Sequence, residues 1–168
     1  MAVKQVLLVP DPYLKKVCSP IETFDHGLQS LIEDLEDTRL AHAGCVGIAA
    51  SQIGVLSRVA IVDTSQHKKF AGESSGHLVL INPKITFREG ERVGREGCLS
   101  LPDFTANVRR SLRIELEYWD ASGGQRKLTA ENFEAVVIQH ELDHLDGILF
   151  LDRVANLNTD VFARKTSA

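Results

Sequence analysis

The segment 129–147, TAENFEAVVIQHELDHLDG, constrains the fold most, because its periodicity is helical and its apolar side chains lie on two opposite sides. A helix of this kind is buried on both sides. We predict that it runs from Thr129, as the N-cap, to Asp146 and ends at Gly147, with one face on the core and the other lining a pocket. The pocket face carries Phe133, Val136, Val137, His140 and His144, and the core face carries Ala135, Ile138, Leu142 and Leu145.

Two histidines on the pocket face, His140 and His144, stand four residues apart with Glu141 after the first. This spacing places both imidazoles on one side of a helix, one turn apart, which suits two vertices of a tetrahedral metal site. Glu141 lies beside them, where its carboxylate can contact a water on the metal. A single buried histidine is usually a packed core residue, but this pair favours a metal site.

The two common protease patterns that contain H-E-x-x-H do not fit this chain. The metzincin pattern needs a methionine turn and a third histidine, but this sequence has Phe150 at the histidine position and Met1 as its only methionine. The thermolysin pattern takes its third ligand from a downstream glutamate, and residues 145–168 contain none. The third ligand is therefore expected upstream.

Cys98 is the best upstream candidate for the third ligand. It lies between turn-rich segments, and Gly97 before it permits close approach of the backbone to a ligand. The residues alone leave a second interpretation open, in which Cys98 is an inert buried cysteine. That packing role is the one we expect for Cys18 and Cys45.

The rest of the chain combines one more helix with strands, which predicts an α+β fold. A helical repeat of leucine and isoleucine runs from about Asp25 to Ala41. We expect antiparallel strands packed around the buried helix that carries H-E-x-x-H, with a hairpin after the ASGG turn. The strands are predicted at 58–64, 77–83, 84–89 and 111–120, the last with an apolar face of Leu112, Ile114, Leu116 and Tyr118.

Length, net charge and cysteine count indicate a single-domain protein and argue against nucleic-acid-binding, disulfide-rich and membrane-spanning classes. A chain of 168 residues fits one domain, so we expect residues 1–168 to form a single catalytic domain. A net charge of −4 without a basic block disfavours nucleic-acid binding through bulk charge. Three widely spaced cysteines do not make a disulfide framework, and no apolar run approaches the ~20 residues that span a bilayer. Without a signal peptide, we expect a cytoplasmic protein that does not enter membranes.

Three motifs in a fixed order resemble those of peptide deformylases. The chain has CVGIAASQ at 45–52, EGCLS at 96–100 and QHELDH at 139–144. The second and third match the family patterns E-G-C-L-S and Q-H-E-x-D-H in full, and the first departs from G-x-G-x-A-A-x-Q at its first glycine. VLLVPDPYLKKVCSPI and LINPKI also resemble family segments, so the similarity covers nearly the whole chain.

The resemblance implies removal of the formyl group from the N-terminal formyl-methionine of nascent polypeptides. It implies one divalent metal ion held by Cys98, His140 and His144, with a water as fourth ligand. The ion would be Fe²⁺ in the cell, with Zn²⁺, Ni²⁺ or Co²⁺ able to substitute. A thiolate with two imidazoles also suits iron or zinc better than magnesium or calcium.

The resemblance also implies roles for three catalytic residues. Glu141 would act as the general acid and base, and the Gln52 side chain and the Leu99 backbone N–H would bind the reacting carbonyl oxygen. The methionine side chain needs an apolar slot, and the alternative for the slot residues is ordinary core. The residues expected to bind substrate are Val46, Gly47, Ile48, Gly97, Phe133, Val136 and Val137, with the peptide as an added strand beside 45–48.

Several positions depart from the family pattern. Cys45 replaces the first glycine of the first motif and Ile48 replaces the usual leucine, which we interpret as a local packing change that alters the substrate groove. Many members carry an arginine seven residues after the metal cysteine, where this chain has Thr105. We expect that contact with the end of the substrate to be missing or to be supplied by Arg109 or Arg110.

Three hypotheses for function follow. The first is a metal-dependent deformylase whose partner is the formyl-methionyl nascent peptide. The second is a different zinc-dependent amidase or peptidase, and the third is a non-catalytic paralogue that binds formyl peptides or ribosomes. Intact catalytic and ligand positions argue against the third. Some members dock on the ribosome through a long C-terminal helix. The resemblance does not carry that docking over, because this chain ends with LDRVANLNTDVFARKTSA, and the ribosome is kept as a second candidate partner.

Overall fold

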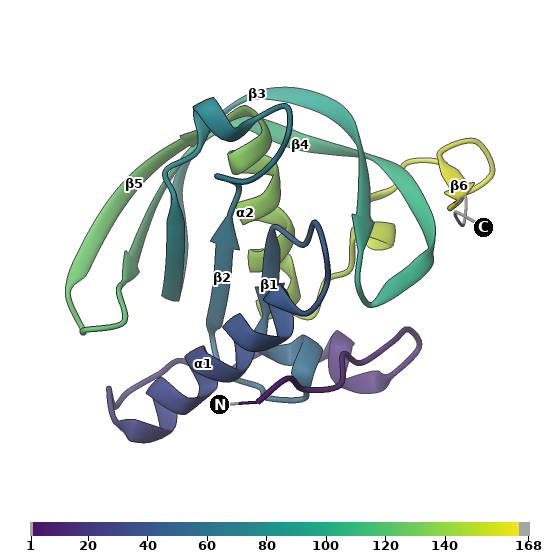
Figure 1. Ribbon diagram of the computed structural model, residues 1–168. Coiled ribbons are helices and arrows are strands. Elements are labelled where there is room, and N and C mark those ends of the chain that lie inside the picture. Colours follow the sequence, from purple (N-terminus) through teal and green to yellow (C-terminus); the bar gives the residue numbers. More distant parts are fainter. Residues whose placement is uncertain (1, 165–168) are drawn as a thin grey trace.

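The computed structural model describes residues 2–164 and confirms the α+β architecture (Figure 1). One sheet has the strand order β1-β2-β3-β4-β5, with β6 paired to β4, and every pairing between these strands is antiparallel. The strands are β1 Gly47–Ala49, β2 Val59–Asp63, β3 His77–Cys98, β4 Leu101–Trp119, β5 Gln125–Glu131 and β6 Val161–Ala163. The helices are α1 His26–Leu40 and α2 Asn132–Leu145, with short 3-10 helices at Pro12–Lys15, Ala50–Ile53, Ala71–Glu73 and Phe150–Arg153.

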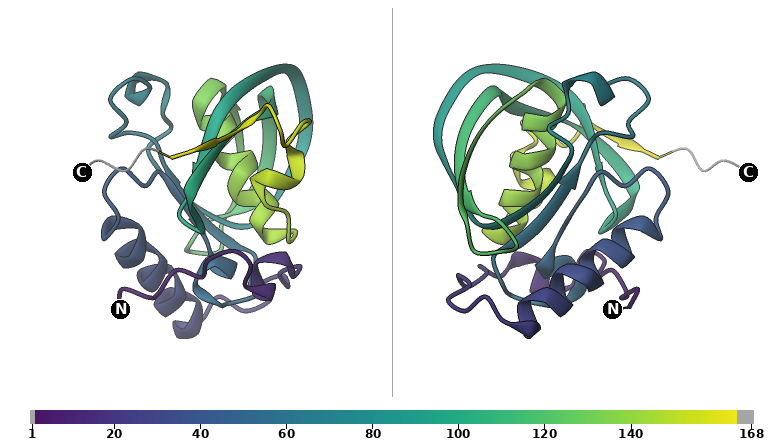
Figure 2. Two further views of the ribbon diagram at one scale, coloured as in Figure 1. Left: turned by 90° about the vertical axis from the view of Figure 1, so that its right-hand side faces the viewer. Right: turned by 60° about the vertical axis from the view of Figure 1, so that its left-hand side comes forward.

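Strands β3 and β4 are long and curve around α2, as two directions of view show (Figures 1 and 2). The prediction of separate strands at 77–83 and 84–89 is wrong, because β3 continues through both. The pairing of β3 with β4 shifts in register between Ile81 and Lys84, and Asn82 lies in the left-handed region with φ 51°. This irregularity lets one strand pass Pro83 without ending.

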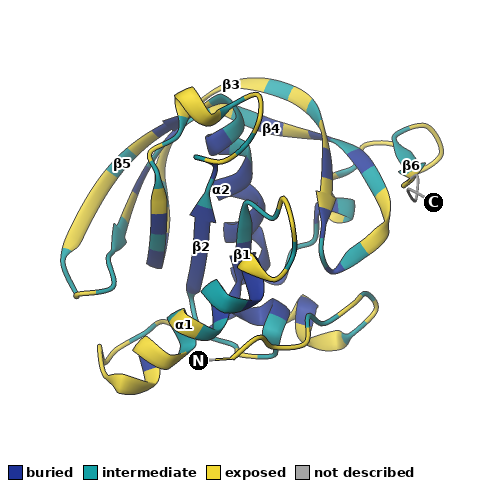
Figure 3. Cartoon of the chain, in the orientation of Figure 1, coloured by how far each residue is buried: buried dark blue, intermediate teal, exposed yellow. Residues whose placement is uncertain are grey.

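Helix α2 is buried on both sides, as its sequence predicts (Figure 3). Its N-cap is Glu131, two residues later than expected, so the prediction of Thr129 as N-cap is wrong. Thr129 belongs to β5, where it pairs with Glu115, and the hairpin pairing continues to Glu131. Asn132, with φ 54°, then turns the chain from strand into helix. The hairpin register, which the local sequence does not encode, sets where α2 starts.

Two of the hydrophobic clusters in the core meet at the sheet. Ile138 and Leu142 of α2 pack with Leu80, Ile114 and Leu116 on one side. Helix α1 covers the other side through Leu28 and Leu35, which pack against Ile48 and Ile61.

The predicted limits of α1 are confirmed, and Asp25 caps it by accepting a hydrogen bond from the Leu28 N–H at 3.0 Å. Leu112 is an exception to the predicted apolar face of β4. It is 39% exposed, and its side chain covers Gly90 instead of the core. Among residues 2–164, neither helix has the length and apolar character needed to cross a membrane.

The contact between α2 and the sheet predicts a large effect of truncating its core face. Ile138→Ala should lower the free energy of unfolding by about 2–5 kcal/mol, because Ile138 is fully buried and the cavity would not collapse. Leu157→Ala is the control, since Leu157 is 64% exposed. Denaturant unfolding checks both, and an equal loss in the two variants would contradict the packing described here.

Candidate metal centre

Three side chains with metal-binding atoms meet at the end of β3. Cys98 is the last residue of β3, and His140 and His144 lie on consecutive turns of α2. One donor atom from each lies within 4.8 Å of the others, and all three residues are buried. The Cys98 Sγ is 3.3 Å from Nε2 of His144. The structure therefore brings together the two histidines of the helix and the upstream cysteine.

The donor set fits a tetrahedral transition-metal ion. Metal–sulfur and metal–nitrogen bonds of about 2.3 and 2.0–2.1 Å place neighbouring donor atoms roughly 3.5 Å apart. The observed 3.3 Å between Cys98 and His144 matches that separation. Burial lowers the pKa of His144 well below its usual value, so this imidazole is neutral and has a free lone pair for a metal. Phe150, at the third-histidine position of metzincins, stacks on the His140 ring instead.

The second nitrogen of His140 is held by a carboxylate. Its Nδ1 is 2.9 Å from Oε1 of Glu96, two residues before Cys98 on β3. Arg110 of β4 donates two hydrogen bonds to Glu96, at 2.8 and 2.9 Å. Burial would raise the pKa of Glu96, but hydrogen bonds from Arg110 and His140 outweigh it and lower the pKa to about 2. The ionised carboxylate fixes the ring so that the other nitrogen faces Cys98 and His144.

The Glu96–Arg110 pair continues into a buried network that returns to α2. Arg110 Nη1 donates to Asp143 at 2.5 Å, and Arg153 donates two further hydrogen bonds to the same carboxylate. Glu96, Arg110 and Asp143 are all buried. The network therefore joins β3, β4 and α2 directly behind the cluster of Cys98, His140 and His144.

Glu141 lies beside the cluster, and its carboxyl group has a raised pKa. Its side chain is buried, and Oε1 has no hydrogen-bond partner among the described residues. Burial raises the pKa of Glu141 to about 7. A Cβ added to Gly47 would lie 2.7 Å from Oε2 of Glu141, so only glycine at this position leaves room for the carboxylate. A carboxyl group with this pKa can both accept and donate a proton near neutral pH.

The Gln52 amide is oriented by hydrogen bonds on both sides. Its Oε1 accepts from the Ala49 N–H at 3.0 Å. Its Nε2 lies 3.1 Å from the Ser100 hydroxyl and 3.5 Å from Cys98 Sγ. The N–H₂ group of Gln52 therefore points toward the cluster.

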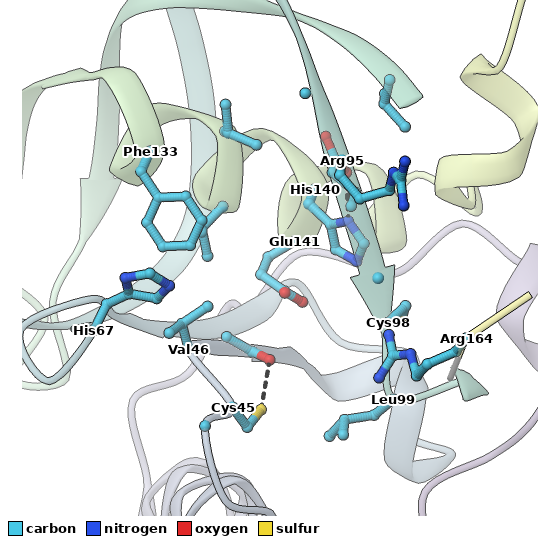
Figure 4. A pocket seen from close by; sticks show the side chains of 18 of the residues that line it. Cys45, Val46, His67, Arg95, Cys98, Leu99, Phe133, His140, Glu141 and Arg164 are labelled. Carbon is cyan, nitrogen blue, oxygen red and sulfur yellow. Dashed lines mark hydrogen bonds and ion pairs between the residues drawn. The ribbon is translucent and has the colours of Figure 1, made fainter. Parts of the chain in front are cut away.

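A pocket of about 330 Å³ opens over these residues (Figure 4). Ile48 is the exception among the predicted substrate-binding residues, because its side chain is fully buried against α1 and does not line the pocket. Alternation along β1 turns Ile48 away while its neighbour Gly47 faces the pocket. The predicted site residues that line the pocket are Val46, Gly47, Gln52, Gly97, Cys98, Leu99, Phe133, Val136, Val137, His140 and Glu141.

Some pocket residues were not expected from the sequence. The His67 ring stacks with Phe70 and lies 4.6 Å from the Phe133 ring, so the segment between β2 and β3 closes one end of the pocket. Cys45, whose replacement of a family glycine predicted a change in the substrate groove, lines the pocket, and burial raises the pKa of its thiol to about 11. No local pattern marked His67, since its role depends on how a loop folds over α2.

Neither candidate for the missing arginine contact lies in the pocket. Arg110 is buried and pairs with Glu96 and Asp143. Arg109 is exposed and pairs with Glu91 at 3.0 Å. Thr105 is in β4 and pairs with Phe162 of β6. Arg92, Arg95 and Arg164 line the pocket instead, and none of these was singled out from the sequence.

Comparison with known proteins agrees with the motifs and with this geometry. The sequence model of the polypeptide deformylase family matches residues 3–160. The chain belongs to the peptide deformylase family. The peptide deformylase of Rhizobium meliloti is 40% identical over 166 residues, which are 98% of this chain and 92% of that protein.

Solved peptide deformylases share the fold. The enzyme from Thermus thermophilus is 41% identical, with a TM-score of 0.81 over 91% of this chain and 86% of that chain. The one from Legionella pneumophila is 38% identical, with a TM-score of 0.84 over 93% and 88%. The resemblance seen in three motifs therefore extends to the whole architecture.

The buried network predicts unequal effects of two adjacent arginines. Arg110→Met should lower the free energy of unfolding by about 3–5 kcal/mol, because it leaves Glu96 without its buried partner. Arg109→Met, at an exposed neighbour, should change it by less than about 1 kcal/mol. Urea unfolding of metal-free protein separates the two, and a neutral Arg110 variant would show that the network contributes little.

Proposed function

We propose that this chain is a metal-dependent hydrolase that removes the formyl group from the N-terminal formyl-methionine of nascent polypeptides. The observation that carries the proposal is a buried Cys–His–His cluster beside a carboxyl group of near-neutral pKa, at the base of a pocket. Family membership favours this function over a different amidase or a non-catalytic paralogue.

Cys98, His140 and His144 would hold the metal ion. We propose Fe²⁺ in the cell, with Zn²⁺, Ni²⁺ or Co²⁺ as substitutes, because a thiolate and two imidazoles suit these ions. When bound, such an ion lowers the pKa of water and polarises a carbonyl group. Glu96 contributes by holding the His140 ring in the ligand orientation.

Glu141 moves the proton. It accepts a proton from the attacking water as the new C–O bond forms, and then delivers it to the amine nitrogen as the C–N bond breaks. Formate and a free N-terminal amine are the products. The pKa of about 7 makes both transfers accessible at neutral pH.

The Gln52 N–H₂ and the Leu99 backbone N–H stabilise the developing oxyanion. Gln52 cannot rotate its carbonyl toward the substrate, because Oε1 already accepts the Ala49 N–H. Loss of one donor of this kind typically slows catalysis by about 10²–10³.

Substrate selection has two sources. A formyl carbon carries only hydrogen, so a confined site excludes acetyl and larger acyl groups. The methionine side chain would enter the apolar part of the pocket between Val46, Phe133, Val136 and Val137. A structural relative from Acinetobacter baumannii was solved with Met-Ala-Ser bound. It is 31% identical to this chain, over 91% of this chain and 99% of that chain.

The peptide backbone would add as a strand at β1. Among the described strands, β1 pairs only with β2, so its other edge is open for hydrogen bonds. Gly97 lines the pocket and would face the other side of the peptide.

We further propose that residues 1–168 act as a single catalytic domain in the cytoplasm, where nascent chains emerge from ribosomes. We assign no ribosome-docking segment. A net charge of −4 argues against nucleic-acid binding through bulk charge.

Metal content tests the ligand assignment. Protein purified without oxygen should contain one metal ion per chain, measured by mass spectrometry, and Cys98→Ala should lose it. Cys18→Ala should retain it, because Cys18 is buried in a separate cluster with Leu145. Full metal content in the Cys98 variant would refute the assignment.

Turnover tests the reaction. The metal-loaded protein should hydrolyse formyl-Met-Ala-Ser and leave acetyl-Met-Ala-Ser essentially intact, and Glu141→Gln should slow the reaction by about 10²–10⁴. Equal turnover of both peptides would indicate a different amidase. No turnover above the Glu141 variant would indicate a binding protein.

A further inference from the structure

The last strand of the sheet places an arginine at the substrate pocket. Strand β6 pairs with β4, and the Arg164 N–H donates to the Asp103 carbonyl at 2.8 Å. These main-chain bonds fix the start of the Arg164 side chain next to the turn between β3 and β4. Arg164 lines the pocket together with Gly97 and Leu99, and its side chain extends into the pocket beside Leu99 (Figure 4).

The absence of a side chain at Gly97 makes room for Arg164. A Cβ added to Gly97 would lie 2.0 Å from Nη2 of Arg164 and 3.5 Å from Cγ2 of Thr105. The guanidinium therefore lies against the backbone one residue before the metal-binding Cys98. A peptide held between β1 and Gly97 would pass this guanidinium directly after its formyl-methionine.

Arg164 forms no ion pair or hydrogen bond through its side chain with any residue between 2 and 164. Exposed arginines elsewhere are paired: Arg109 with Glu91 at 3.0 Å, and Arg126 with Asp120 at 2.8 Å. Two further arginines that line the pocket, Arg92 and Arg95, also lack a carboxylate partner within the described chain, and Arg95 packs on the Phe162 ring.

Positive charge thus gathers at the pocket of a protein whose net charge is −4. The carboxylates that line the pocket are Glu141 and Glu96. Glu141 lies beside the metal cluster, and Glu96 is already bound by Arg110 and His140. A guanidinium without a partner binds a carboxylate through two parallel hydrogen bonds, more strongly than it binds a backbone carbonyl.

We propose that Arg164 is a substrate-binding residue that gives this enzyme a preference for formyl peptides with an acidic side chain within two residues after the methionine. An extended chain advances roughly 3.3 Å per residue, so both positions pass within reach of the guanidinium. This proposal rests on the proposed function, because it takes the formyl peptide as the ligand. It also explains how this chain contacts the substrate end despite Thr105.

The test compares aspartate with asparagine, which have the same shape but different charge. The substrates are amidated formyl-Met-Asp-Ser, formyl-Met-Asn-Ser, formyl-Met-Ala-Asp and formyl-Met-Ala-Asn, so that no terminal carboxylate interferes. For metal-loaded protein, KM should be about two- to five-fold lower for aspartate at one position or both, with kcat unchanged. The preference should shrink at 0.5 M salt, because exposed charges are screened.

Three variants separate a binding role from a structural one. Arg164→Gln should abolish the preference, so that KM becomes equal for each aspartate peptide and its asparagine counterpart. Arg164→Glu should reverse the charge selection, so that formyl-Met-Lys-Ser exceeds formyl-Met-Asp-Ser. Arg109→Gln, the matched control outside the pocket, should retain the wild-type preference.

Binding distinguishes failure of this proposal from failure of the proposed function. The Kd of fluorescent formyl peptides can be measured by anisotropy in a Glu141→Gln background, where turnover is not needed. Aspartate selectivity in Kd that Arg164→Gln removes would support the proposal even if no deformylation occurs. Equal affinity for aspartate and asparagine peptides, or selectivity unchanged in Arg164→Gln, would overturn the proposal for Arg164. Normal turnover in the same protein would show that the deformylase function itself still holds.

Discussion

The buried carboxylate of Glu96 is the interaction on which the site depends. It joins His140 of α2 to Arg110 of β4. Arg110 in turn donates to Asp143, which lies on α2 one turn after His140. The β3–β4 hairpin and the later helix α2 are thereby held together. Because a buried charge without partners is costly, the network disfavours any packing that shifts α2 relative to β3. That constraint keeps the two histidines opposite Cys98.

Close backbone approach is the second requirement of the site. Gly47 gives space to the Glu141 carboxylate, and Gly97 gives space to the Arg164 guanidinium. Neither glycine adopts a positive φ, so their role is steric and not conformational. Because Gly47 and Gly97 carry no side chain, Glu141 of α2 and Arg164, directly after β6, line the pocket at these two positions.

Residues near one another in sequence were predictable. The helical spacing of His140 and His144, the burial of α2 on two sides and the limits of α1 all follow from local periodicity and chemistry. Errors arose where pairing between strands overrode local signals. Pro83 did not end β3, because a register shift absorbed it, and Thr129 stayed in a hairpin instead of capping α2.

The sequence by itself determined which chemistry is available: two imidazoles and a carboxyl group on one helical face, and a cysteine within a family motif. It did not determine which residues from other parts of the chain contact these groups. Contacts such as Glu96 with His140, or Arg164 with Gly97, depend on strand register. The pairing of β6 with β4 joins residues about sixty apart in the chain, and no local pattern specifies it. Only the tertiary structure therefore decided how the pocket is closed and which charges line it.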